Sequence, residues 1–177
     1  MARLFFIFFA LSCLPILLAA QSKGNVMAEA KFGLIWEVPK SWTKSAVKNG
    51  VKYASKKGED YIVVTAQPIP STQEEKEKAI VKFLKDEVSI YDYASFAKDA
   101  KSLTHNGLKV LTYTEDDEPD LEEAEDPEDY EGLWTKILIT EHKDKLVMIS
   151  ITEIYNKRRK LEKELNIIFN SIKPHGK

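Results

Sequence analysis

The chain has 177 residues, of which 44% are hydrophobic and 31% are charged, with a formal net charge of −2 and a single cysteine. This length fits one domain once a targeting segment is removed, and one cysteine excludes an internal disulfide and a multi-cysteine metal site. The charge is unevenly distributed, because residues 115–131 hold 12 of the 28 acidic residues. Outside this segment, the chain after residue 20 carries 25 basic and 16 acidic residues, a net charge of +9. Such asymmetry suggests interaction surfaces.

The first twenty residues are predicted to be a secretory signal peptide. Arg3 gives a short basic start, an apolar run covers residues 4–18, and the small residues Ala19 and Ala20 follow. This order is typical of a segment that directs export and is then removed. We therefore expect cleavage after Ala20 or Ser22 and a mature protein in the periplasm or at the cell envelope.

Two alternatives remain open at this end of the chain. A retained membrane anchor would need about 20 apolar residues, and the run is shorter. A lipoprotein attached through Cys13 would need a lipid-attachment box, which the preceding residues match poorly. Residues 21–30 show no clear period and are predicted to be a flexible lead into a single domain at residues 31–174.

Residues 31–39, KFGLIWEVP, alternate between apolar and other side chains and predict a strand that Pro39 ends. One side of this strand is expected to carry Phe32, Leu34, Trp36 and Val38. Hairpin turns are predicted at Asn49-Gly50, Lys57-Gly58 and Asn106-Gly107, because Asn and Gly accept the positive φ that such turns require. Residues 61–66 are β-branched and apolar, which favours a central strand.

Ser71 begins the sequence STQE, which has capping-box spacing and predicts the start of a helix. Its apolar stripe is interrupted by Glu87, and residues 91–100 either finish this helix or form a second short turn. The segments LWTKILITE and KLVMISITEI predict two strands joined at residues 142–144 and buried on both faces. A last helix is expected to begin near Asn156 and to end before Pro174.

These elements predict an α+β fold. About six or seven strands follow one another in antiparallel order, and helices occur in the middle and at the end rather than after every strand. We therefore expect an antiparallel sheet that is covered by helices on both faces, and not a doubly wound parallel sheet.

Two segments resemble a known family. FGLIWEVPKSW, residues 32–42, resembles the opening strand and Pro-x-x-Trp turn of PsbP/DcrB-like domains, and LNIIFNSIKP, residues 165–174, resembles their terminal helix. The resemblance spans about residues 30–174 and implies the PsbP-like α/β/α sandwich. The matching residues are Phe32, Ile35, Val38, Pro39, Trp42, Ile168, Phe169, Ser171, Ile172 and Pro174.

The resemblance implies an exported, non-enzymatic domain that binds other proteins. Known members are extrinsic subunits of the photosynthetic oxygen-evolving complex, bacterial periplasmic or lipoprotein factors, and adaptors, and a related fold binds a nuclear-transport GTPase. The family brings no catalytic residues, and it offers no counterpart for the acidic insertion at residues 115–131.

Three interpretations of the acidic residues 115–131 remain open. Blocks of like charge are usually solvated and extended loops, but this one would also suit docking to a basic partner or to the basic remainder of the chain. The third interpretation is a divalent-cation site, because Ca²⁺ takes six to eight oxygen ligands. Its ligands would be Asp116, Asp117, Glu118, Asp120, Glu122 and Glu123, although the order of a calcium-binding loop is missing.

Catalytic signatures are sparse. The three histidines are His105, His142 and His175, and the sequence contains no nucleophile elbow, phosphate-binding glycine loop or zinc motif. A hydrolase would need Ser150 or Thr152 to lie beside one of these histidines. We therefore predict no enzyme, no catalytic residue and no cofactor apart from the Ca²⁺ hypothesis.

The sequence favours an exported, monomeric, non-enzymatic binding or accessory protein of the cell envelope that acts through protein–protein contacts. One alternative is a periplasmic protein that binds a divalent cation or small ligand with the acidic loop, and another is an unrecognised hydrolase. Export disfavours nucleic acid as a partner. The basic residues 157–160 leave peripheral contact with an anionic membrane open.

Overall fold

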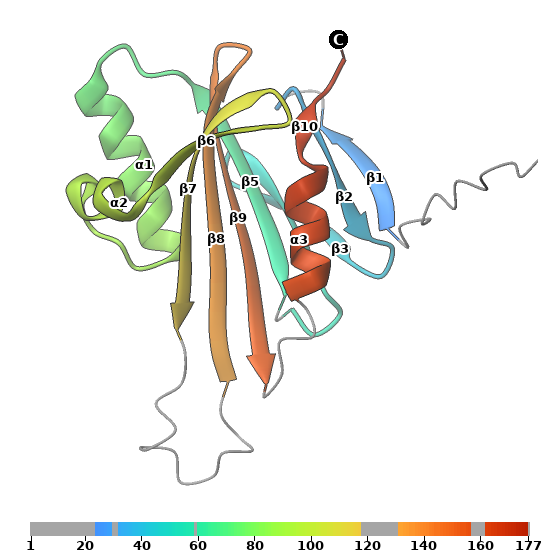
Figure 1. Ribbon diagram of the computed structural model, residues 1–177. Coiled ribbons are helices and arrows are strands. Elements are labelled where there is room, and N and C mark those ends of the chain that lie inside the picture. The colour runs from blue at the N-terminus through green and yellow to red at the C-terminus, as the bar shows by residue number, and fades with distance from the viewer. Residues whose placement is uncertain (1–23, 30–31, 59, 118–130, 157–161, 177) are drawn as a thin grey trace, which may run out of the picture.

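A seven-stranded antiparallel sheet forms the centre of the protein (Figure 1). The computed structural model describes residues 24–29, 32–58, 60–117, 131–156 and 162–176. The strands of this main sheet are β3 (Thr43–Val47), β4 (Gly50–Ala54), β5 (Tyr61–Pro68), β6 (Lys101–His105), β7 (Leu108–Asp117), β8 (Glu131–His142) and β9 (Lys145–Asn156). Their order is β3-β4-β5-β9-β8-β7-β6, and every neighbouring pair is antiparallel. The predicted α+β class with an antiparallel sheet is therefore confirmed.

A second, three-stranded sheet lies beside the first and was not predicted. It consists of β1 (Gly24–Glu29), β2 (Leu34–Pro39) and β10 (Lys173–Pro174), with β2 in the middle. Residues 24–29, predicted to be part of a flexible lead, instead pair with β2 along its length. Backbone groups of a strand need partners, and β1 supplies them to one edge of β2.

The first predicted strand therefore covers the main sheet instead of extending it. Phe32, Leu34, Trp36 and Val38 are all at most 3% exposed, as the alternation of the sequence predicts. Their side chains join one hydrophobic core cluster with Ile62 and Ile149 of the main sheet. At the end of β2, the Trp42 N–H donates to the Pro39 carbonyl (3.0 Å), and the Trp42 ring packs against this core.

Both faces of the main sheet are covered, as predicted for strands that are apolar on both sides. The helices are α1 (Gln73–Glu87), α2 (Tyr93–Asp99) and α3 (Glu162–Ser171). Figure 1 shows α1 and α2 on one side of the sheet, with α3 and the small sheet on the other side. Ile80, Phe83 and Phe96 of the first two helices pack on alternate residues of the central strands, such as Val63 and Ile137.

The helix boundaries differ in detail from the sequence expectation. Thr72, rather than Ser71, caps α1, and its hydroxyl accepts the Glu75 N–H at 3.2 Å. The Glu75 carboxylate accepts from the backbone of Thr72 and from the Ser71 hydroxyl, so the capping box lies one residue later than predicted. The ambiguous residues 91–100 contain α2, which is capped by Asp92. At the other end, β9 occupies Asn156, where a helix was expected to begin.

The Asn106-Gly107 turn has the expected conformation, and the first hairpin turn lies one residue earlier than predicted. Asn106 and Gly107 have φ values of 48° and 84° and join β6 to β7 as predicted. Lys143 and Asp144 connect β8 to β9 with positive φ at both residues, although neither is glycine. The first hairpin turns at residues 48–49, because Gly50 already pairs within β4.

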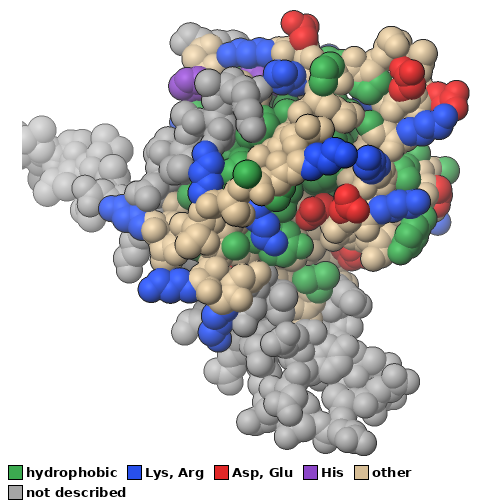
Figure 2. Space-filling model, turned by 180° about the vertical axis from the view of Figure 1, so that it is seen from behind, with side chains coloured by type: hydrophobic (Ala, Val, Ile, Leu, Met, Phe, Trp, Pro, Cys, Tyr) green, Lys and Arg blue, Asp and Glu red, His purple; other side chains and the backbone are tan. Residues whose placement is uncertain are grey.

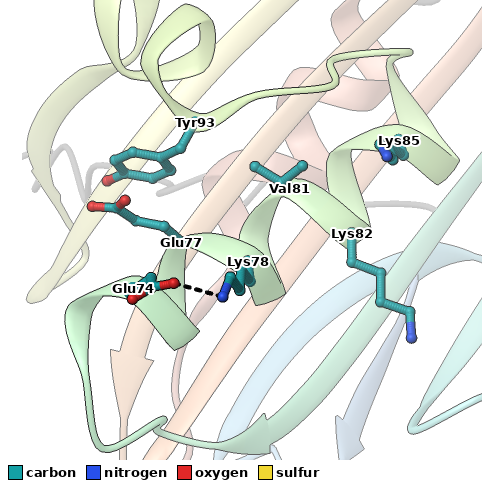
Figure 3. A pocket seen from close by; sticks show the side chains of 7 residues that line it. All are labelled: Glu74, Glu77, Lys78, Val81, Lys82, Lys85 and Tyr93. Carbon is teal, nitrogen blue, oxygen red and sulfur yellow. Dashed lines mark hydrogen bonds and ion pairs between the residues drawn. The ribbon is translucent and has the colours of Figure 1, made fainter.

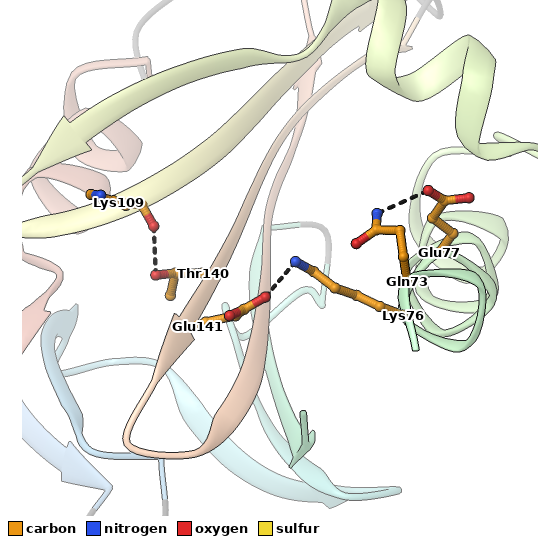
Figure 4. Close-up of polar contacts among 6 residues, drawn as sticks. All are labelled: Gln73, Lys76, Glu77, Lys109, Thr140 and Glu141. Atoms are coloured by element: carbon orange, nitrogen blue, oxygen red, sulfur yellow. Dashed lines mark hydrogen bonds and ion pairs between the residues drawn. The ribbon is translucent and has the colours of Figure 1, made fainter. Parts of the chain in front are cut away.

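Side-chain contacts fasten the layers to one another. Lys76 of α1 forms an ion pair with Glu141 of β8, which joins the helix layer to the main sheet (Figure 4). Within the sheet, the Thr140 hydroxyl of β8 donates to the Lys109 carbonyl of β7 at 2.8 Å. On the opposite face, the Asn106 amide donates to the backbone carbonyls of Asn170 and Ile172 at 2.8 and 2.9 Å. This turn therefore holds the end of α3. No helix in the described part of the chain is long and apolar enough to span a membrane.

Candidate functional site

The proposed cation ligands fall mostly outside the described residues. Asp116 and Asp117 end β7, opposite Trp134 and Leu133 of β8, while Glu118, Asp120, Glu122 and Glu123 belong to the undescribed residues 118–130. Within the described ranges, no group of three or more His, Cys, Asp or Glu side chains could hold a metal ion. The cation site therefore stays a prediction, as do the roles of the signal peptide and of residues 157–160, which also lie outside those ranges.

The histidines are not placed beside the serine and threonine that a hydrolase would use. Ser150 lies opposite Ile137 on β8, and His142 lies five residues further along the same strand, which corresponds to about 16 Å. His105 has its Nε2 2.9 Å from the Phe169 carbonyl of α3, on the opposite face of the sheet. The geometry therefore gives no support to a serine–histidine pair.

A buried polar cluster lies between the main sheet and the end of α1. Thr152 Oγ1 is 3.2 Å from Thr135 Oγ1 and 3.3 Å from Ser150 Oγ, and all three residues are 0% exposed. Ser150 is hydrogen-bonded to Glu87 of α1, and Thr152 to Tyr61 of β5. The three hydroxyl groups are therefore hydrogen-bonded to one another in the protein interior. They are shielded from solvent, so a substrate could not reach them from the surface without an opening.

Glu87 is the charged member of this cluster. The pKa of the Glu87 carboxyl is raised, and burial is the largest cause. The hydrogen bond from Ser150 and the positive charge of Lys52 lower this pKa, whereas the negative charge of Asp86 raises it further. Its Oε2 has no hydrogen-bond partner among the described residues. The sequence signalled this residue as the break in the apolar stripe of α1, but its partners come from β9 and could not be identified from the helix.

We expect Glu87→Gln to stabilise the protein at neutral pH. Folding raises the pKa of the Glu87 carboxyl. Its contribution to the stability of the folded protein is therefore fully present at pH values below the unfolded-state pKa, and it is lost as the pH rises through the folded-state pKa. The Tm difference between variant and parent should therefore grow from acidic to neutral pH and reach a few degrees. Thermal melts across this pH range test it. A difference that stays constant, or that shrinks with rising pH, contradicts the assignment.

An open groove of about 410 Å³ runs along the outer side of α1 beside α2. Figure 3 shows its lining, in which Lys78 and Glu74 are joined by an ion pair of 2.6 Å. Five of the seven lining residues are charged, and Val81 and Tyr93 are the other two. Small-molecule sites usually enclose most of their ligand, whereas this groove is open to solvent, so it is a weak candidate for a ligand. Its full lining is Glu74, Glu77, Lys78, Val81, Lys82, Lys85 and Tyr93.

A stronger candidate is the edge of the main sheet formed by residues 40–57, here called the basic edge. It contains β3, the first loop and β4, and it carries six lysines and no acidic residue. The lysines are Lys40, Lys44, Lys48, Lys52, Lys56 and Lys57. Four consecutive residues of β3, numbers 43–46, are exposed. The sequence signal was a lysine at every fourth position from 40 to 56, which was overlooked because it resembles ordinary solvated surface.

Known proteins share the fold but little sequence. No family model matches the chain, and no curated protein sequence matches it. Cyanobacterial PsbP from Synechocystis has 14% identity and a TM-score of 0.54 over 93% of this chain and 98% of that protein. A protein from Bacteroides thetaiotaomicron has 9% identity and a TM-score of 0.52 over 88% of this chain. This chain spans 50% of the length of the Bacteroides protein.

A third solved structure is the Ran-binding protein Mog1p of Saccharomyces cerevisiae. It has 10% identity and a TM-score of 0.46 over 84% of this chain and 94% of that protein. The similarity to cyanobacterial PsbP, which covers nearly the whole of both chains, confirms the PsbP-like fold implied by the two sequence segments. At this level of identity the similarity establishes the fold alone.

Proposed function

We propose that this protein is an exported, non-enzymatic binding or accessory protein of the cell envelope that acts through protein–protein contacts. The observation that carries the proposal is the open, uniformly basic edge of the main sheet. Strand edges display unpaired backbone groups, and a row of like charges on such an edge favours partners of opposite charge.

The fold supports the same function. PsbP/DcrB-like domains, which the sequence resembles and whose fold the cyanobacterial PsbP shares, serve as extrinsic subunits and adaptors rather than as enzymes. Fold does not determine function, but the buried hydroxyl cluster and the charged, open groove both favour a protein that works through its surface. Export rests on the apolar segment at residues 4–18 and on its small-residue ending.

The proposal is tested with tagged full-length protein produced in its source cells. We expect the protein in the exported fraction, with an N-terminus that begins after Ala20 or Ser22, and we expect lysine-reactive crosslinking in the intact envelope to join it to another protein. Mass spectrometry reads both results. Retention in the cytoplasm with an intact N-terminus would contradict export, and the absence of protein crosslinks at native abundance would contradict the binding function.

A further inference from the structure

The outer face of α1 carries its charges in two blocks. The first half of the helix contributes Glu74 and Glu77 to the open groove, and the second half contributes Lys82 and Lys85. Figure 3 shows the two acidic side chains at one end of the groove and these two lysines at the other end. A face that is acidic at one end and basic at the other favours a partner with the opposite arrangement.

The protein itself uses these charges only in part. Lys78 and Glu74 form an ion pair of 2.6 Å, but their side chains are 73% and 77% exposed, and a pair in water contributes little. Lys82 is exposed and forms no ion pair or hydrogen bond within the described ranges of the chain. Lys85 is also exposed, and its Nζ lies 5.5 Å from the centre of the Tyr91 ring. These charges are therefore available to a partner.

The order of the charges is complementary to that of a second α1 helix that runs in the opposite direction. Residues 74, 78, 81 and 85 follow at intervals of three and four, so they lie along one face of the helix. One antiparallel register, centred between residues 79 and 80, pairs all six groove residues of α1 with those of the second helix, and no two like charges are directly opposed. The facing pairs are Glu74 with Lys85, Glu77 with Lys82, and Lys78 with Val81.

We propose that this face of α1 is a docking surface for a second copy of the same chain, with the two α1 helices antiparallel across a two-fold axis. Such a contact uses the same patch on both subunits, so each pair of facing residues occurs twice. Tyr93 of α2 lines the same groove and would border the contact. The inference goes beyond the function proposed above, and it departs from the monomer that the sequence favoured.

The mixture of charges favours a second copy over the other possible occupants. An anionic membrane would be repelled by the acidic block, and Figure 2 shows Asp and Glu side chains close to Lys side chains on the right half of the rear face. The openness of the groove disfavours a small molecule but leaves room for a helix of another subunit. A second copy carries the required order of charges without any further condition.

The dimer is expected to be weak. Each subunit would contribute mainly one helix of 15 residues, which is small compared with the surface that stable complexes bury. We therefore expect a dissociation constant between about 10 µM and 1 mM. Added salt should raise this constant, because exposed charges hold the two helices together.

The test uses the protein as its source cells produce it, in sedimentation velocity at concentrations up to about 1 mM. We expect the parent to dimerise. The variants Glu74→Lys/Glu77→Lys and Lys82→Glu/Lys85→Glu place like charges opposite each other, so each alone should have a dissociation constant about tenfold higher or more. An equal mixture of the two variants restores every facing pair and should dimerise about as well as the parent.

A matched control separates this contact from diffuse attraction. Lys40→Glu/Lys173→Glu changes the net charge as the lysine variant of α1 does, but on exposed residues of the small sheet and its end. It should dimerise as the parent does. A monomeric parent, a mixture that stays monomeric, or equal losses in the control and the α1 variants would each overturn the proposal.

A second measurement needs no substitution. Amide chemical shifts of the parent, recorded over a dilution series, should change with concentration for residues 74–85 and Tyr93 and stay constant in β3 and β10. Shifts that change elsewhere and not in α1 would overturn the proposal. The binding function proposed above concerns other proteins of the envelope, so it would stand in that case.

Discussion

Replacing Trp36 by alanine is expected to lower the free energy of unfolding by about 3–5 kcal/mol. Trp36 is 1% exposed and is among the largest fully buried side chains. Its ring contacts Tyr53 of the main sheet edge-on, with centroids 6.1 Å apart, and lies 6.3 Å from the Phe32 ring. Because Trp36 belongs to β2, its removal opens a cavity between the small sheet and the main sheet. Urea denaturation followed by circular dichroism measures the loss.

The substitution Trp36→Phe is the matched control. The indole N–H of Trp36 is buried and has no acceptor among the described residues, so phenylalanine removes an unsatisfied donor as well as some volume. We expect this variant to lose clearly less stability than the alanine variant. A loss below about 1 kcal/mol for Trp36→Ala would be typical of a surface site and would show that β2 does not share the main core.

Local sequence patterns predicted the strands of the main sheet because burial has a simple period. Alternation in residues 32–38 matched the observed buried side of β2. Apolar residues on both faces of the segments now seen as β8 and β9 placed them at the centre, between two covered faces. These predictions depend only on which side chains leave water, which is a property of each segment by itself.

The second sheet could not be predicted, because alternation does not tell whether a strand extends a sheet or covers it. Strand β1 has the sequence GNVMAE, with no strong period, and β10 has two residues, one of them Pro174. Both owe their strand geometry to β2, since their pairing with it depends on contacts across the fold. Tertiary context of this kind overrides weak local preferences.

The candidate site was missed for a related reason. Residues 115–131 hold the most concentrated charge in the sequence and prompted the cation and docking hypotheses, whereas the lysines of residues 40–57 are spaced out between polar and apolar residues. Only the pairing register places Lys44 of β3 and Lys52 of β4 on opposite faces of the main sheet. Glu87 was visible as an anomaly in its helix, but Ser150, its partner, comes from a strand more than sixty residues later in the chain.

Gly50→Ala is expected to lower the free energy of unfolding by about 3 kcal/mol. The cause of this loss is different from the one that the sequence suggested. The Asn49-Gly50 pair predicted a glycine needed for positive φ, but only Asn49 has a positive φ, of 58°. Gly50 lies within β4, opposite Thr65 of β5. A Cβ atom at this position would lie 2.3 Å from the Val64 carbonyl oxygen and 2.9 Å from Thr65 Cγ2. Backbone cannot move aside as a flexible side chain can, so β4 must separate from β5 at this point.

Gly107→Ala is the control that isolates this contact. Gly107 has φ of +84°, and a Cβ atom added there would meet nothing within 4 Å, so alanine costs only the strain of left-handed backbone, about 1–2 kcal/mol. Urea titrations of both variants should therefore give the larger loss at Gly50, together with faster amide exchange in β3 and β4 than in β9. Equal losses at the two glycines would mean that β4 and β5 can separate at little cost. In that case the outer hairpin would be too loosely attached to present a fixed surface to a binding partner.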